Sequence, residues 1–167
     1  MYLYGNDSEE LILRPKEVYD GPIPSGNSAA TFNFLKLSRI LEDSDMEQCA
    51  DKQFQAFGNS LKSNPTAHSF LLQAFTLKNK PASKIVLVGK RDDETYKEIY
   101  RTINSRFLPF VTKVFINEKM EGGSEVKRRL SGYKPVDNRC TAYICKDFSC
   151  LEPTNDRNKI LEMINSF

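Results

Sequence analysis

The sequence predicts an α/β protein in which helical hairpins are followed by a small α/β layer. In the first half, apolar residues recur every three or four positions, which is the period of an amphipathic helix. In the second half, the continuous β-branched and leucine run at residues 85–88 ends at Gly89, a pattern typical of a strand buried on both faces. The period changes near Pro81, so we expect one region at residues 1–81 and a second at residues 82–167.

Three helices are expected before Pro81. The first follows Pro22 and Pro24 and spans about residues 28–41, the second covers the apolar positions from 46 to 61, and the third follows Asn64-Pro65 and extends through residue 75. Upstream, residues 2–4 and 11–14 are predicted to pair as a hairpin. About 80 residues of helical hairpin bury little surface alone. Either they pack against the α/β layer or they belong to a larger helical array.

After Pro81 we expect a three-stranded, mostly parallel sheet with covering helices. Strands are predicted at residues 85–89 and 111–116, joined by a helix that begins at Asp92 or Asp93 and forms a right-handed crossover. A short helix at residues 124–130, a third strand at residues 141–145 and a last helix after residue 156 complete the chain.

The composition excludes several classes of partner. Lys and Arg total 24 against 22 Asp and Glu, so a net charge of +2 gives no strong field for nucleic acid or an anionic membrane surface. No apolar run approaches the roughly 20 residues of a membrane span, and the first residues do not resemble a signal peptide. We therefore expect a cytoplasmic protein with reduced cysteines and with neither nucleic acid nor membrane as a partner.

No catalytic residue, metal ligand set or cofactor motif is predicted. Cys140, Cys145 and Cys150 are five residues apart, which is not the Cys-x-x-Cys spacing of redox motifs or zinc sites, so we expect buried structural thiols. His68 is the single histidine and cannot act as both acid and base, so a surface or helix-packing role is expected.

One polar loop is the candidate ligand-facing segment. Two interpretations are open for its side chains: they face a ligand, or they satisfy a turn and a helix N-terminus, for which these residue types are preferred. The residues concerned are Glu17, Asp20, Ser25 and Asn27.

Three motifs carry a family resemblance. Residues 11–28, from Leu11-Ile12-Leu13-Arg14-Pro15-Lys16-Glu17 to Pro24-Ser25-Gly26-Asn27-Ser28, resemble a segment of the YyaL / spermatogenesis-associated thioredoxin-domain family, as do residues 84–89 and the stretch from 132–136 to 141–145. The resemblance covers essentially the whole chain, with Pro22 where the family more often has alanine.

The resemblance implies a parent protein with an N-terminal thioredoxin-like domain, then an α/α toroid similar to N-acylglucosamine epimerases and six-hairpin glycosidases, then this C-terminal region. The helices before Pro81 would close the toroid. The expected partners are therefore those upstream domains, with a possible sugar ligand in the parent, and this region alone would be non-catalytic and without a cofactor.

Two other functions remain open. The α/β part could bind a sugar or nucleotide at the carboxyl ends of its strands, near Gly89 and Asn117, where open sheets usually place ligands. Alternatively, aromatic residues gathered on one patch would form a docking surface; the candidates are Phe107, Phe110 and Phe115.

Overall fold

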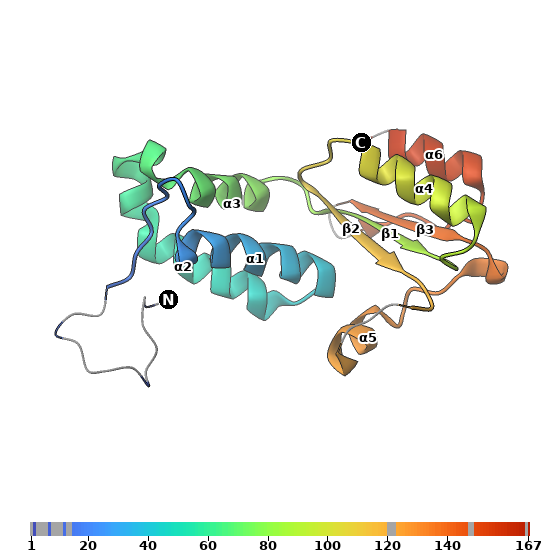
Figure 1. Cartoon of the computed structure of the whole chain (residues 1–167), viewed down its shortest axis with the longest axis horizontal. Helices are drawn as coiled ribbons and strands as arrows, with labels where there is room; N and C mark the ends of the chain where they lie inside the picture. The colour runs from blue at the N-terminus through green and yellow to red at the C-terminus, as the bar shows by residue number, and fades with distance from the viewer. Residues whose placement is uncertain are drawn as a thin grey trace. The chain divides into compact units, whose positions relative to one another are not determined.

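The chain forms two compact units. The computed structural model describes residues 2, 7, 12, 15–119, 123–146, 149–165 and 167 (Figure 1). The helical unit comprises Met1–Ser38 and Asp43–Lys80, and the α/β unit comprises Arg39–Glu42 and Pro81–Phe167. The predicted hairpin at residues 2–14 falls on positions of which only three are described, so it stays a prediction.

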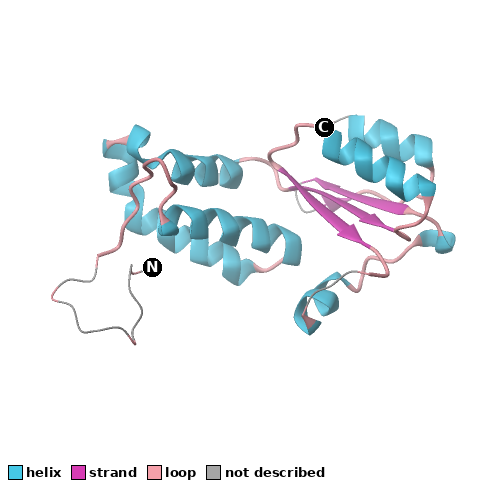
Figure 2. Ribbon diagram, in the orientation of Figure 1, coloured by secondary structure: helices cyan, strands magenta, loops and turns pink. Residues whose placement is uncertain are grey.

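The helical unit contains the three predicted helices and one 3₁₀ turn (Figure 2). Asp43 begins the second helix by accepting hydrogen bonds from the backbone N–H groups of Asp45 and Met46 at 2.9 and 3.3 Å. Pro65 occupies the first position of the 3₁₀ turn, where its missing N–H group costs nothing. The elements are α1 (Gly26–Leu41), α2 (Ser44–Ser63), η1 (Pro65–His68) and α3 (Ser69–Asn79).

Some apolar residues of the helical unit are buried, and others face solvent. Val18, Phe57 and Leu71 form a small buried cluster, with Phe54 and Leu61 packed against it. In α1 and α3, by contrast, other large apolar side chains face solvent: Leu37 is 40% exposed and Phe75 is 45% exposed.

The α/β unit is built on a four-stranded mixed sheet in the order β2-β1-β3-β4. β1 pairs in parallel with β2 and antiparallel with β3, and β3 pairs antiparallel with β4. The α/β class is confirmed, but the expectation of three mostly parallel strands was wrong, because hydrophobic periodicity identifies a strand without giving its direction. The strands are β1 (Ser83–Val88), β2 (Val111–Ile116), β3 (Thr141–Lys146) and β4 (Ser149–Cys150).

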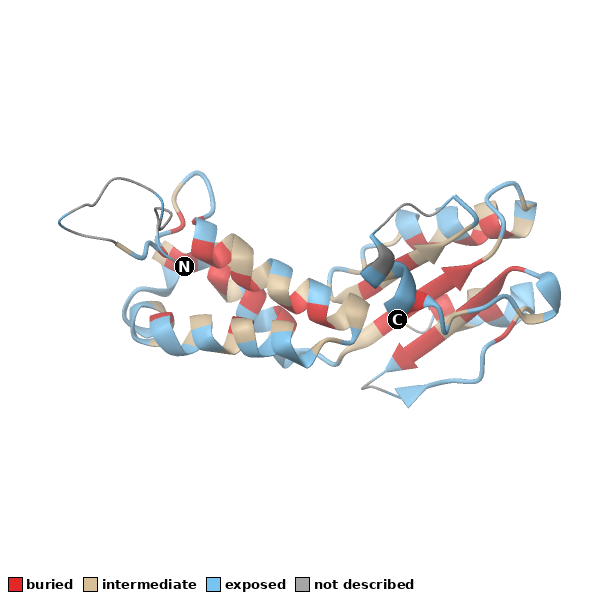
Figure 3. Ribbon diagram, turned by 90° about the horizontal axis from the view of Figure 1, so that it is seen from below, coloured by how far each residue is buried: buried red, intermediate tan, exposed pale blue. Residues whose placement is uncertain are grey.

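Each face of the sheet has its own core. The helices α4 (Glu94–Ser105) and α6 (Arg157–Asn165) cover one face, where Ile85 and Leu87 of β1 are fully buried together with Ile160 of α6. The short helix α5 (Ser124–Leu130) and Ile40 pack against the other face. A 3₁₀ turn, η2 (Val136–Asn138), precedes β3. Buried residues predominate along the inner strands (Figure 3).

Candidate functional site

Asp20 is the centre of the predicted polar loop, and both of its carboxylate oxygens accept hydrogen bonds from the chain's own backbone. Its Oδ1 accepts a hydrogen bond from the N–H of Ser25 at 2.9 Å. Its Oδ2 accepts from the N–H groups of Phe70 and Leu71 at 2.9 and 3.1 Å, at the start of α3. The Asp20 N–H donates to the carbonyl of Ala67 at 2.8 Å. One carboxylate therefore closes its own turn and caps α3.

Burial raises the pKa of Asp20, but hydrogen bonds from Ser25, Leu71, Ser28 and Phe70 outweigh burial and hold this pKa below its ordinary value of 3.8. The carboxylate is thus ionised at neutral pH although its residue is only 7% exposed. Its negative charge lies at the positive end of α3, which is a favourable position.

The other predicted loop residues also contact the chain itself. The Ser25 hydroxyl bonds to the Ser28 hydroxyl at 2.9 Å and accepts from the Ser28 N–H at 3.2 Å. The Asn27 side chain donates to the backbone carbonyl of Glu17 at 2.6 Å, while the Glu17 side chain faces solvent. These contacts are those expected if the loop satisfies a turn and a helix N-terminus. A role toward sugar stays a prediction.

His68 has a packing role. It is 7% exposed, and its Nδ1 lies 2.9 Å from the carbonyl oxygen of Val18. Together with Asp20, His68 therefore fixes residues 18–20 against the turn that leads into α3.

A second polar cluster, on the α/β unit, was not predicted. Lys84 of β1 has only 8% of its side chain exposed, and its ammonium group is ion-paired with Glu42 and donates to the Tyr133 hydroxyl at 2.7 Å. The Tyr133 hydroxyl in turn donates to the Glu42 carboxylate at 2.8 Å. The Lys84 ammonium also lies 5.1 Å from the Tyr133 ring centroid, a cation–π distance. We call these three residues the Lys84 cluster.

The charges in the Lys84 cluster stabilise one another. The hydrogen bond from Lys84 is the main reason that the pKa of Glu42 is lowered. Burial lowers the pKa of Lys84, but the bonds to Glu42 and Tyr133 outweigh it and raise this pKa above 10.5. Burial raises the pKa of the Tyr133 hydroxyl. None of these groups is poised to exchange a proton near neutral pH, so the cluster is suited to holding charge rather than to acid–base catalysis.

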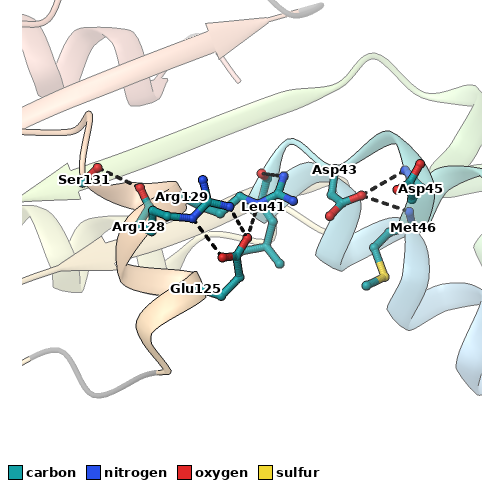
Figure 4. Close-up of polar contacts among 8 residues, drawn as sticks. All are labelled: Leu41, Asp43, Asp45, Met46, Glu125, Arg128, Arg129 and Ser131. Carbon is teal, nitrogen blue, oxygen red and sulfur yellow. Dashed lines mark hydrogen bonds and ion pairs between the residues drawn. The ribbon is translucent and has the colours of Figure 1, made fainter.

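The Arg39–Glu42 segment, which belongs to the α/β unit, contacts the rest of that unit at several points. Ile40 packs on the sheet, and the Arg39 guanidinium donates to the carbonyl of Phe110. Figure 4 shows that Arg129 of α5 donates to the carbonyl of Leu41. Glu42 adopts a left-handed φ of 54°, which non-glycine residues rarely adopt. The ion pair with Lys84 helps to offset the cost of that backbone conformation.

Two cysteines form a disulfide, which corrects the expectation of reduced structural thiols. Cys145 of β3 is bonded to Cys150 of β4, and the two are opposite one another in the antiparallel register. The sequence pattern gave no sign of β4, so the pairing of residues five apart could not be seen. Cys140 and Cys49 are free. Burial raises the pKa of the Cys140 thiol to about 12, which makes this thiol unreactive.

The carboxyl end of β1, the alternative ligand position, is closely packed. A Cβ atom added at Gly89 would lie 3.0 Å from the Tyr96 ring and 3.2 Å from the Cys140 backbone. The Tyr96 hydroxyl is buried and has no hydrogen-bond partner among the described residues. A ligand at Gly89 would need these side chains to move, so binding there stays a prediction.

The three candidate aromatic residues differ in exposure. Phe107 is 90% exposed, whereas Phe110 and Phe115 are partly buried. The Phe115 ring packs edge-on against Tyr100 at 4.6 Å between centroids and contacts the core beneath α4. Only Phe107 therefore presents most of its surface to solvent.

Sequence similarity to known proteins extends along nearly the whole chain. The chain is similar to spermatogenesis-associated protein 20. The human protein of that name is 26% identical over 159 residues, covering 93% of this chain and 20% of the human protein. Spermatogenesis-associated protein 20 of Rattus norvegicus is 26% identical over 160 residues, with the same coverage. The uncharacterized protein B0495.5 of Caenorhabditis elegans is 28% identical over 162 residues, covering 95% of this chain and 22% of that protein.

The chain thus spans about a fifth of the length of the curated relatives it matches. The similarity to spermatogenesis-associated protein 20 supports the family resemblance found in the sequence motifs. No family model matches the chain, and no solved structure matches it at a significant level.

The described residues contain no group of three or more His, Cys, Asp and Glu side chains arranged to hold a metal ion. Within the same part of the chain, no helix has both the length and the apolar character needed to cross a membrane.

Proposed function

We propose that this chain is a C-terminal, non-catalytic region of a cytoplasmic protein related to spermatogenesis-associated protein 20. Its helices would complete an α/α toroid, and its α/β unit would cap that toroid. The support is a similarity that covers 93% of this chain but only 20% of the human relative. The partners in this proposal are the upstream toroid and thioredoxin-like domains.

The observation that carries the proposal is the bonding of Asp20. Both of its carboxylate oxygens accept backbone hydrogen bonds, from Ser25 on one side and from Phe70 and Leu71 on the other. A carboxylate that binds a sugar hydroxyl needs a free acceptor position aimed at the ligand. Asp20 instead uses its oxygens to join two parts of the helical unit, which is a structural role.

The helices themselves support a place in a larger array. α3 carries apolar residues on more than one side: Leu71, Ala74 and Leu77 are buried, while Phe75 is 45% exposed. A helix that is apolar around much of its circumference normally packs against neighbours on several sides. Further toroid helices would supply those neighbours.

The proposal is tested by comparing the full-length protein with a version that lacks the residues of this chain. Disulfide reduction and sugar isomerisation or hydrolysis are measured, together with the thermal midpoint. We expect the shortened protein to lose thermal stability and whatever activity the intact protein has, and we expect this chain alone to give no turnover of sugar. Turnover of sugar by this chain alone, or a shortened protein of unchanged stability and activity, would contradict the proposal.

Asp20→Ala in the full-length protein separates the structural role from sugar binding. A structural role predicts a lower thermal midpoint with saccharide affinity unchanged in the folded protein. Loss of saccharide binding at unchanged stability would identify the loop as a ligand site instead.

A further inference from the structure

The Cys145–Cys150 disulfide lies in a row of residues that crosses one face of the sheet. In the strand register, Thr112 of β2 is opposite Lys84 of β1, Lys84 is opposite Cys145 of β3, and Cys145 is opposite Cys150 of β4. Directly opposed residues point to the same face and have neighbouring side chains. A buried lysine is therefore the register neighbour of one sulfur of the disulfide.

The two sulfur-bearing residues differ in access. Cys145 is 3% exposed, whereas Cys150 lies on the exposed edge strand β4. Thiol–disulfide exchange requires a thiolate to reach one sulfur along the S–S axis, and access decides which sulfur is attacked. An incoming thiol can therefore reach Cys150, with Cys145 as the leaving group.

Lys84 is placed to assist that departure. A positive charge beside a cysteine favours its thiolate form, and a better leaving thiolate makes exchange faster. Lys84 shares its charge with Glu42, but 64% of the Glu42 side chain is exposed to water, which screens its charge, while the Lys84 side chain is 8% exposed. Lys84 and Cys145 are opposite one another in the strand register, so the charge of Lys84 is carried on the sheet face that holds Cys145.

We propose that Cys145–Cys150 is a reactive disulfide that exchanges with external dithiols, with Cys150 receiving the nucleophile and Cys145 leaving beside Lys84. One thiolate of the dithiol attacks the Cys150 sulfur, the bond between Cys150 and Cys145 breaks, and Cys145 departs as a thiolate. In the mixed disulfide, the first sulfur of the dithiol is bonded to Cys150. The second thiolate of the dithiol then attacks that first sulfur and releases Cys150 as a thiolate. The dithiol is oxidised to a disulfide, and the two cysteines are reduced and take up two protons.

The fold can accommodate both redox states. Beyond the disulfide, Thr154 remains joined to Ala142 of β3 by two backbone hydrogen bonds of 2.9 and 3.2 Å. Ile160 and Ile164 of α6 are fully buried in the core with α4. Reduction therefore removes the covalent tie on β4 without removing the contacts that hold α6.

The experiment uses the intact chain and dithiothreitol as the dithiol. The protein is incubated with excess reagent under native conditions, and free thiols are trapped by alkylation and located by mass spectrometry. We expect Cys150 to become alkylated within minutes while circular dichroism stays native, and buried Cys145 to be alkylated more slowly. If the two cysteines are labelled only after unfolding, the disulfide is structural and inert. If the purified protein has both thiols free and oxidised glutathione does not convert them to a disulfide, no disulfide forms. Either result overturns the proposal.

Single-cysteine variants test which sulfur is attacked. Cys145→Ser leaves the exposed Cys150 and should form a mixed disulfide with oxidised glutathione faster than Cys150→Ser, which leaves the buried Cys145. Equal rates, or the opposite order, would overturn the assignment of Cys150 as the attacked sulfur.

The role of Lys84 is tested with Lys84→Met, which keeps the length of the side chain without its charge. Reduction by dithiothreitol should slow by about threefold or more. Lys146→Met is the matched control, because Lys146 follows Cys145 on the same strand but lies over the Phe167 ring; its rate should be unchanged. A Lys84→Met rate equal to that of the unmodified protein would remove Lys84 from the mechanism.

Discussion

Asp20 caps a helix that begins far along the chain: its Oδ2 accepts a hydrogen bond of 2.9 Å from the N–H of Phe70, fifty residues away. Helix N-termini leave backbone N–H groups without partners, and a capping side chain usually comes from the residue just before the helix. In α3, that position is held by His68, whose side chain makes no capping bond. Asp20 in a distant loop supplies the cap instead, so this turn residue joins its own loop to the start of α3.

Asp20→Asn should lower the free energy of unfolding by about 1–2 kcal/mol at neutral pH, since the amide keeps one acceptor oxygen of the two and loses the charge. Because the folded-state pKa of Asp20 lies below 3.8, its contribution is present above about pH 4 and is lost as pH falls through that lowered pKa. The difference between the two proteins should therefore shrink in acid. Urea unfolding across this pH range measures it. Glu17→Gln, in the same loop but exposed, is the control and should match the unmodified protein.

The Lys84 cluster should respond unequally to loss of its two charges. Glu42→Gln leaves the buried Lys84 ammonium without a counter-ion and should destabilise the protein by about 1–2 kcal/mol. Lys84→Met replaces that ammonium with an apolar group and leaves Glu42 free to face water, so the change should stay within about 1 kcal/mol. Thermal unfolding at neutral pH compares them. If Lys84→Met proved the more damaging variant, the cluster would be a net source of stability rather than a satisfied buried charge.

An exposed ion pair provides the reference for the Lys84 cluster. Glu125 of α5 pairs with Arg128 and Arg129 at 2.6 and 2.9 Å, and these bonds lower its pKa to about 2. All three side chains are substantially in contact with water, where such pairs add little stability. Glu125→Gln should therefore leave the thermal midpoint unchanged, and a drop as large as that of Glu42→Gln would contradict the distinction drawn from burial.

Alkylation of the native protein should distinguish the two free cysteines. Cys140 is buried and its pKa is raised to about 12, so iodoacetamide should not modify it at neutral pH. Cys49 is partly exposed on α2 and should react. Mass spectrometry of peptides after alkylation, with and without denaturant, measures both. Native labelling of Cys140 would show that the core beneath α4 and α6 opens readily.

Two glycine substitutions should have opposite effects. Gly89→Ala places a methyl group 3.0 Å from Tyr96 and 3.2 Å from the Cys140 backbone, and such overpacking should cost about 1–3 kcal/mol. Gly58→Ala meets nothing within 4 Å in the middle of α2 and should stabilise by about 0.5–1 kcal/mol through helix propensity. Chemical denaturation of both variants tests the pair. A neutral Gly89→Ala would mean that Tyr96 moves aside at little cost.

Much of the fold follows from local sequence patterns. The strand at 111–116 and the helix at 124–130 match their predicted bounds, and α4 begins after Asp93, whose side chain accepts from the Thr95 N–H at 2.8 Å. In these segments periodicity and capping residues point to the same structure. Strand direction and the two-residue strand β4 could not be obtained in this way, because they depend on pairing between distant segments.

In the polar sites, too, local contacts could be predicted from the sequence and long-range contacts could not. That Asp20 and Ser25 close a turn follows from residue preferences, whereas the bonds from Asp20 to α3 require the folded chain. Lys84 stands in the sequence as a polar residue at the start of an apolar strand, and nothing nearby indicates that Glu42 is its partner. An ion pair between residues far apart in the chain produces no periodic pattern in the sequence. The Lys84 cluster therefore could not be predicted from the sequence.

The Arg39–Glu42 segment makes the α/β unit discontinuous in sequence. A protein cut at Pro81 would keep every strand yet lack Ile40 from one apolar face and the counter-ion of Lys84. Such an excised domain should be prone to aggregation and should regain solubility when residues 39–42 are fused to it. The two units are therefore divided within α1 as well as after α3.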